Sequence, residues 1–281
     1  MSYATSASRR LLRNPQALLG GVFLVVICIM AFTANVWYPD DPLGMVAPPL
    51  LWPGEMSEFP LGSDSLGRDV ASGIVHGARV SLAVGVVAAV LSLAIGVTVG
   101  SIGGYFGGWL DDVLVRLTEL FQTVPSFLLV IVIVAIGKPG IGVIVTAIGL
   151  ASWPVIARLV RAQFRSLRES EFVLAARSQG FGTWRIIFQE MLPNALPPII
   201  VTTSVLVATA ILIESALAFL GMGDPNVVSW GSMIGDGREQ LRTAWFLSVL
   251  PGAIIIATVL ALNVVGDGLN DALNPRLRGS R

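Results

Sequence analysis

Long apolar runs separated by short polar segments extend along almost the whole chain. A helix rises about 1.5 Å per residue, so about 20 apolar residues are needed to cross the hydrocarbon core of a bilayer, which is about 30 Å thick. Six runs have about this length, and they cover residues 18–37, 79–102, 117–136, 141–158, 196–220 and 244–265. The hydrophobic pattern therefore predicts an all-α membrane protein with six transmembrane helices.

The first apolar run has the features of a permanent signal anchor. Three arginines precede it, and it ends at Trp37 and Tyr38, whose amphipathic rings suit a membrane–water interface. A cleaved signal peptide is the other interpretation. We favour the anchor because the run is longer than the apolar part of a typical secretion signal and lacks a clear small-residue cleavage site.

Arginine residues cluster in three places: ahead of the first span, between the fourth and fifth spans, and at the end of the chain. Six crossings put all three clusters on the same side of the membrane. Because Lys and Arg are enriched in cytoplasmic loops, we expect that side to be the cytoplasm. Both termini are then cytoplasmic, and residues 39–76, 137–140 and 221–243 lie outside.

This orientation divides the chain into three parts. Residues 1–40 are expected to form a cytoplasmic tail and the first transmembrane helix, and residues 41–77 an extracytoplasmic loop with an interfacial helix. Residues 78–281 are expected to form a five-helix core. The interfacial helix is predicted because Asp64 or Ser65 can cap a short helix ahead of the second span.

Composition and missing motifs exclude several functions. Of the 281 residues, 54% are hydrophobic and only 13% are charged, against about 25% charged in a soluble domain. The net charge of zero gives no reason to expect nucleic acid as a partner. Cys28 cannot form a disulfide within the chain and His76 lacks partners at metal-ligand spacing, so we expect no metal site and no cofactor in this chain.

The sequence contains no phosphate-binding loop and no hydrolase motif. We therefore expect that this chain is not an enzyme and does not hydrolyse ATP itself. Transport against a gradient would then need either an ion-coupling site within the spans or a separate ATPase.

The cytoplasmic loop at residues 170–194 has the pattern of two short helices with a break between them. Ser170 is a suitable N-cap for the first helix, and Gly180 interrupts it. Thr183 can cap the second helix, and Pro193 is expected to end it. Small residues leave a shallow face on the first helix, so we interpret this loop as a docking element for another protein.

The order of residues in this loop resembles the E-x-x-A-A-x-x-x-G…I…L-P segment of ABC importer permeases. In that family the segment forms coupling helices, which enter a cleft on an ATP-binding subunit and transmit force to the spans. The resemblance implies coupling roles for Glu171, Ala175, Ala176, Arg177, Gly180, Ile187, Leu192 and Pro193. It also implies the type I importer permease fold, with residues 170–194 as the coupling loop.

Other stretches resemble the C-type permease of dipeptide and oligopeptide importers, namely residues 60–69, 77–82, 229–233 and 263–275. The additional N-terminal span matches that subfamily as well. The resemblance implies a bacterial inner-membrane complex with a second permease, two ATP-binding subunits that hold ATP and Mg²⁺, and an extracytoplasmic solute-binding protein. The expected cargo is a di- or oligopeptide, and related C-type permeases also serve nickel and glutathione systems.

Polar residues in or near the spans are candidates for the transport pathway or its gating: Glu214, Asn263 and Asp267. An unpaired carboxylate in the centre of a span costs about 2.5–3.5 kcal/mol on insertion scales, so Glu214 should face protein or water. For Glu214 we favour a packing or pore-lining role over a proton relay. The alternative function is a proton-coupled secondary transporter that relies on Glu214 and Asp267.

Asp64, Arg68 and Asp69 could dock the solute-binding protein, and helix capping and solvation explain them equally well. At the start of the third span, the spacing of acidic and arginine residues between positions 112 and 119 favours ion pairs on one helix face. Five glycines between residues 100 and 108 form no phosphate-binding fingerprint. We expect them to permit a tight turn and close helix packing.

Overall fold

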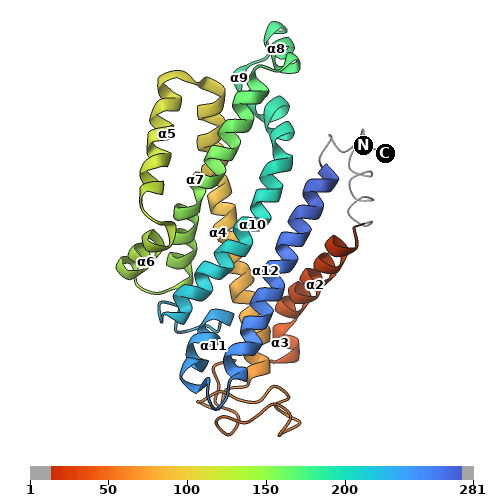
Figure 1. Cartoon of the computed structure of the whole chain (residues 1–281), viewed down its shortest axis with the longest axis vertical. Helices are drawn as coiled ribbons and strands as arrows, with labels where there is room; N and C mark the ends of the chain where they lie inside the picture. Colours follow the sequence, from red (N-terminus) through yellow and green to blue (C-terminus); the bar gives the residue numbers. More distant parts are fainter. Residues whose placement is uncertain (1–13, 274–281) are drawn as a thin grey trace.

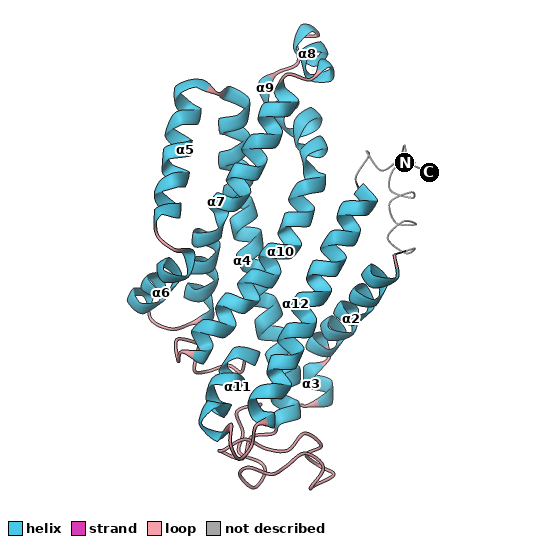
Figure 2. Cartoon of the chain, viewed as in Figure 1, coloured by secondary structure: helices cyan, strands magenta, loops and turns pink. Residues whose placement is uncertain are grey.

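The computed structural model describes residues 14–273, which form a bundle of helices joined by loops (Figure 1 and Figure 2). By length and composition, five helices can cross a membrane, or six if one bent pair counts as a single span. Within the described residues, pairing of extended backbone is limited to one bridge between Ser63 and Asp69. The predicted all-α membrane fold is therefore confirmed.

The helices follow in chain order, and the labels are those of Figure 1. They are α2 (Pro15–Phe32), α3 (Ala34–Trp37), α4 (Val70–Phe106), α5 (Gly108–Thr123), α6 (Ser126–Gly137), α7 (Ile141–Arg168), α8 (Glu171–Ser178), α9 (Thr183–Arg185), the π-helix η1 (Ile186–Met191), α10 (Leu192–Phe219), α11 (Trp230–Gly237), the 3₁₀-helix η2 (Arg238–Gln240) and α12 (Phe246–Leu273). The first predicted span thus comprises α2 and the short α3.

The third predicted span, residues 117–136, is not one straight helix. α5 and α6 meet at an 80° bend around Val124 and Pro125. Val124 has an extended backbone (φ −91°, ψ 130°), because a proline ring disfavours the helical conformation of the residue before it. α6 consequently leaves the direction of α5 (Figure 1).

Of residues 41–77, where an extracytoplasmic loop with an interfacial helix is expected, residues 41–69 form a loop and residues 70–77 are the start of α4. The carboxyl oxygen of Asp64 accepts hydrogen bonds from two backbone N–H groups within the next four residues, each at 2.8 Å, and so closes a turn. The expectation of a helix capped by Asp64 or Ser65 is therefore wrong. α4 begins at Val70, where Asp69 is the N-cap and accepts from the N–H of Ala71 at 2.9 Å.

The second helix of the 170–194 loop does not end at Pro193. The chain stays helical from α9 through η1 into α10. At the end of η1 the N–H of Leu192 donates to the carbonyl of Ile187, five residues back. This wider turn suits a following proline, whose ring would otherwise clash with the carbonyl four residues before it. Pro193 therefore lies in the first turn of the fifth span, and the loop and the span are joined by continuous helix.

α4 packs closely along α7, and glycines make this possible. A Cβ atom at Gly100 would lie 2.5 Å from the carbonyl oxygen of Ala157, and one at Gly104 would lie 2.6 Å from the Cβ of Phe164. Small residues let two membrane helices approach to this degree. Gly107, with a φ of 68°, forms the turn from α4 to α5. The expected roles of these glycines in packing and turning are confirmed.

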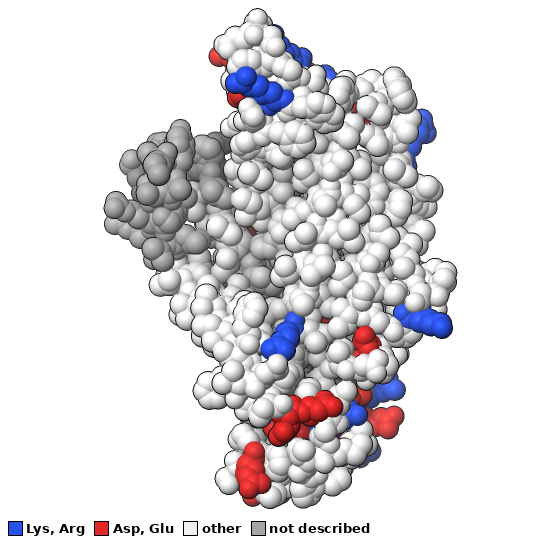
Figure 3. Space-filling view, turned by 180° about the vertical axis from the view of Figure 1, so that it is seen from behind, with Lys and Arg blue, Asp and Glu red and all other residues white. Residues whose placement is uncertain are grey.

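The two ends of the bundle carry different elements. One end of the bundle, called the α8 end, carries α8, the start of α2 and the end of α12 (Figure 1). The 38–69 segment and α11 form the opposite end, called the α11 end. On the face shown in Figure 3, charged side chains gather toward the two ends and leave a broad uncharged band between them. Such a band suits the hydrocarbon core of a bilayer, where charges are costly.

Candidate coupling loop and polar junctions

α8 projects from the bundle at the α8 end (Figure 1). One side of this helix is buried: Val173 and Ala176 belong to an apolar core that also contains Phe164 of α7 and Ile187 of η1. The helix therefore rests on α7 and on the helix that leads into α10, and its other side is free for contact.

Both ends of α8 have contacts with neighbouring helices. Ser170 has the extended backbone of an N-cap, but its hydroxyl donates to the carbonyl of Leu167 at 2.5 Å and does not cap the helix. At the other end, the guanidinium of Arg177 lies 5.2 Å from the ring centre of Tyr105, a cation–π distance. Arg168 donates to the carbonyl of Tyr105 at 3.3 Å. Because Tyr105 is near the end of α4, α8 also contacts α4.

The predicted coupling residues differ in accessibility. Ala176 and Ile187 are buried and Leu192 is partly buried, so these three hold the shape of the loop. The exposed members of the predicted set are Glu171, Ala175, Arg177, Gly180 and Pro193. Only the exposed members can meet a partner directly, and their coupling role stays a prediction.

Sequence reasoning missed exposed apolar side chains on the same loop. Phe172 and Leu174 are 40% and 49% exposed, and Trp184 and Phe188 stack with ring centres 6.0 Å apart while both stay exposed. Helical spacing could have revealed Phe172 and Leu174. Val173 and Ala176 lie three residues apart on the inner face of α8, so the apolar residues next to them in sequence must point to another face. An exposed apolar surface of this kind is typical of a protein contact.

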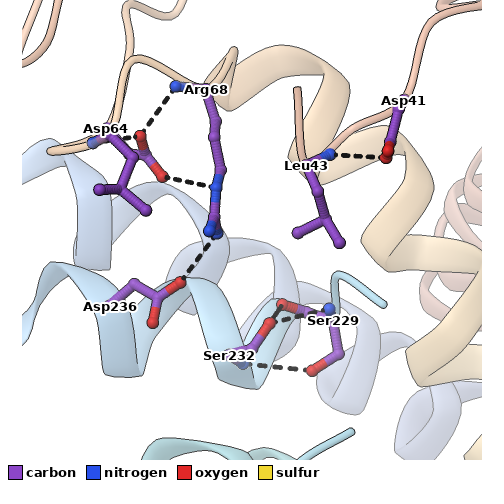
Figure 4. A network of polar contacts seen from close by, with 8 residues as sticks. Asp41, Leu43, Asp64, Arg68, Ser229, Ser232 and Asp236 are labelled. Carbon is purple, nitrogen blue, oxygen red and sulfur yellow. Dashed lines mark hydrogen bonds and ion pairs between the residues drawn. The ribbon is translucent and has the colours of Figure 1, made fainter. Parts of the chain in front are cut away.

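At the α11 end, Arg68 connects the 38–69 segment to α11 (Figure 4). Its Nη1 lies 3.5 Å from Oδ2 of Asp236, and its Nε lies 3.8 Å from Oδ2 of Asp64. These three side chains and Asp69 line a cavity of about 310 Å³. The predicted docking residues Asp64, Arg68 and Asp69 therefore all have partners within the chain, and their docking role stays a prediction.

Asp69 is buried beneath this cavity. Burial raises the pKa of its carboxyl above the usual value for Asp, and the hydrogen bonds from the backbone N–H groups of Ala71 and Ser72 act in the opposite direction. The geometry gives Asp69 a clear role as the N-cap of α4.

Glu214 is 3% exposed in α10. The hydroxyls of Ser81 and Ser215 each donate to its Oε2 at 3.4 Å, so this carboxyl has the partners that a buried polar group requires. Asn263 is partly buried and Asp267 is exposed on α12. Glu214 lies near the end of α10 at the α11 end, and Asp267 lies in the part of α12 toward the α8 end, so the structure does not bring them together.

An ion pair between α5 and α7 was not expected from the sequence. Arg161 donates to Asp111 through Nε at 2.5 Å and through Nη2 at 2.7 Å, a bidentate arrangement. In the part of the chain that the structure describes, no ion pair joins Asp112, Arg116 or Glu119. Helical spacing reveals only contacts within one helix, which is why the interhelical partner was missed.

Comparisons with known proteins extend these observations. Residues 96–279 match the family described as binding-protein-dependent transport system inner membrane component, and residues 2–53 match the N-terminal TM domain of oligopeptide transport permease C. The chain is 38% identical over 273 residues to the di/tripeptide transport system permease protein DppC of Pseudomonas aeruginosa, covering 95% of this chain and 90% of that one. It is 36% identical over 271 residues to the glutathione transport system permease protein GsiD of Pectobacterium atrosepticum, covering 96% and 90%.

Among solved structures, the chain resembles the MetNI methionine ABC transporter in an inward-facing conformation. The TM-score is 0.58 at 18% sequence identity, and the match covers 72% of this chain and 96% of that one. At this level of identity the similarity shows the fold, which is that of an ABC importer permease.

The fold is a bundle of apolar helices long enough to cross a membrane, with a helical loop projecting at one end. The chain belongs to the family of inner-membrane components of binding-protein-dependent transport systems. It is thus the membrane permease subunit of an ABC importer, a translocation subunit whose relatives leave ATP hydrolysis to separate ATPase subunits. The resemblance read from the 170–194 loop is confirmed, and the proton-coupled alternative is not supported.

Proposed function

We propose that this permease imports di- or oligopeptides. The proposal is supported by the printed names of relatives that match almost the whole chain, which include a di/tripeptide permease and a glutathione permease. Glutathione is itself a tripeptide, so both names point to short peptides. The match of residues 2–53 to an oligopeptide permease domain supports the same class of cargo.

The proposed complex contains a second homologous permease, two ATP-binding subunits and an extracytoplasmic solute-binding protein. ATP and Mg²⁺ bind to the ATP-binding subunits, and this chain holds no cofactor. The α8 end faces the cytoplasm of the bacterium, because Arg165, Arg168, Arg177 and Arg185 lie on or beside α8 and positive charge favours the cytoplasmic side. Both termini are then cytoplasmic, and the α11 end is extracytoplasmic.

The structural observation that supports coupling to an ATP-binding subunit is the two-sided character of α8, which has a buried inner face and an exposed outer face. A partner that closes on ATP would displace α8 from its exposed side. Val173 and Ala176 would pass the displacement to α7 and η1, and Arg177 would pass it to the end of α4. Since η1 is continuous with α10, the loop is linked to three spans, which rearrange to give alternating access.

The first test is purification of the chain from its native membrane in mild detergent, followed by mass spectrometry of the bound proteins. We expect a second permease and an ATP-binding subunit, and ATP-dependent uptake of a labelled dipeptide by vesicles. Recovery of the chain alone would contradict the proposal, as would uptake that persists without ATP and collapses with the proton gradient.

A substitution tests the coupling surface itself. Ala175 is exposed on α8, so Ala175→Arg should leave the core intact but obstruct the outer face of the helix. We expect the ATP-binding subunit to be lost from the purified complex. Thr243→Arg is the matched control, because Thr243 is also exposed but lies at the α11 end. Equal recovery of the ATP-binding subunit with both variants would contradict the coupling role of α8.

A further inference from the structure

α11 is a short helix whose amino end is hydrogen-bonded to a side chain of α4, which is bonded in turn to a side chain of α10. The first N–H groups of a helix have no partner within the helix and need one elsewhere. The N–H of Trp230, the first residue of α11, donates to the hydroxyl oxygen of Ser81 in α4 at 3.3 Å. That hydroxyl donates in turn to Oε2 of Glu214 in α10 at 3.4 Å. One serine hydroxyl therefore joins α11 to both spans.

The whole junction is removed from solvent. Ser81 and Trp230 are 0% exposed and Glu214 is 3% exposed. The indole Nε1 of Trp230 donates to the carbonyl of Ile74 in α4 at 3.0 Å, which fixes the same end of α11 a second time. Polar groups in such surroundings are nearly always hydrogen-bonded, and within this chain of hydrogen bonds the orientation of each group depends on the next.

Glycines bring the backbones together at this junction. A Cβ atom at Gly231 of α11 would lie 2.4 Å from the Cα of Ser215, and one at Gly77 of α4 would lie 3.2 Å from the backbone nitrogen of Trp230. α11 therefore cannot shift relative to α4 and α10 without breaking a close backbone contact.

The carboxyl of Glu214 determines how the hydroxyl of Ser81 is used. A helical serine can turn its hydrogen back toward the carbonyl four residues earlier in its own helix. Glu214 offers an acceptor oxygen on the side of α10, which leaves an oxygen lone pair of Ser81 available for the N–H of Trp230.

We propose that Glu214 is a positioning residue, which acts through Ser81 to hold the amino end of α11 against α4 and α10. The three helices then move as one body at the α11 end when the importer changes its access. α11 carries Asp236, the partner of Arg68, so Glu214 also sets the wall of the 310 Å³ cavity at that end. This role differs from a proton relay, because it needs an acceptor oxygen and not a titrating group. It rests on the importer class and not on the identity of the cargo.

The test uses the assembled importer in proteoliposomes and measures ATP hydrolysis stimulated by the purified solute-binding protein, which requires no knowledge of the cargo. We expect Glu214→Ala to lower the maximal stimulated rate about tenfold, which corresponds to about 1.4 kcal/mol, with half-saturation by the binding protein unchanged. Glu214→Gln keeps an acceptor oxygen and should retain the wild-type rate across pH. Ser81→Ala should resemble Glu214→Ala, and the double variant should be no slower than the slower single variant.

Thr258→Val is the matched control. Thr258 is also 0% exposed, but its hydroxyl has no hydrogen-bond partner among the described residues, so its replacement should leave the rate unchanged. A wild-type rate for Glu214→Ala overturns the proposal, and so does a rate for Glu214→Gln as low as that of Glu214→Ala. If Glu214→Ala does not assemble, Ser81→Ala decides, because it removes a single hydroxyl: a wild-type rate overturns the proposal and a loss supports it.

Discussion

The bidentate ion pair between α5 and α7 gives the sharpest prediction about stability. Asp111→Asn removes the charge of the carboxylate with little change of shape and leaves the guanidinium of Arg161 without its counter-ion. Both groups lie where α5 joins the bundle, and α5 has few other polar links to it. The variant should therefore loosen α5 from α7.

The magnitude follows from the exposure of the two side chains. Breaking a fully buried ion pair costs about 3–5 kcal/mol, whereas an exposed pair is worth about 0–1 kcal/mol. The side chain of Asp111 is 9% exposed and that of Arg161 is 30% exposed, so the pair lies between these limits. We expect a loss of about 2 kcal/mol in the free energy of unfolding, consistent with hydrogen bonds to charged groups.

The assay is thermal unfolding of the purified chain in detergent, monitored by intrinsic tryptophan fluorescence. Asp112→Asn is the control, because Asp112 is the exposed neighbour in the same helix and should change stability by less than about 0.5 kcal/mol. The exchanged pair Asp111→Arg with Arg161→Asp should recover part of the loss. Equal unfolding midpoints for Asp111→Asn and Asp112→Asn would refute the reasoning.

Three further predictions concern other contacts. Arg177→Ala removes the cation–π contact with Tyr105, so we expect about 1 kcal/mol less stability and weaker stimulation of ATP hydrolysis by the binding protein in the assembled importer. Gly100→Val places a branched side chain against the backbone of Ala157, where even a Cβ lies only 2.5 Å away, so α4 and α7 should separate and the yield of folded protein should fall. Hydrogen bonds from the backbone N–H groups of Asn226 and Ile141 hold the pKa of Asp224 below its usual range, so its stabilising effect should be present above about pH 4 and be lost as the pH falls through the lowered pKa.

Each of these predictions has a result that would contradict it. If Arg177→Ala leaves the stimulation of ATP hydrolysis unchanged, the contact between α8 and α4 does not take part in coupling. Normal yield of Gly100→Val would show that α4 and α7 can repack. For Asp224, unfolding midpoints are compared between about pH 3 and 6, and Asp224→Asn should show a smaller decline in acid than the wild type. An equal decline in both proteins would exclude Asp224 as a source of the pH dependence.

The length of the apolar runs was sufficient to predict the class of fold and the positions of most spans. Span length is set by the bilayer and helicity by the need to satisfy backbone groups in hydrocarbon, so both are local properties of the chain. The order of residues in the 170–194 loop was also sufficient to indicate the family, because it resembles the coupling segment of ABC importer permeases.

Local signals failed where two local structures were both possible. Asp64 and Asp69 are both able to cap a helix, but the glycines at 62 and 67 adopt positive φ and favour a turn at the first position and a helix start at the second. Pro125 bends the third span, whereas Pro193 follows a π turn and lies within a continuous helix. A proline signal alone does not distinguish these outcomes.

The sequence by itself determined the apolar spans, their order, the family and the candidate coupling residues of this protein. Tertiary structure alone decided which of those residues face outward, that Asp111 pairs with Arg161, and that Glu214 meets Ser81 beneath α11. The reason is physical: span formation depends on neighbours within about 20 residues. The partner of a buried polar group depends on how helices that are distant in sequence pack together, and no local sequence pattern predicts that packing.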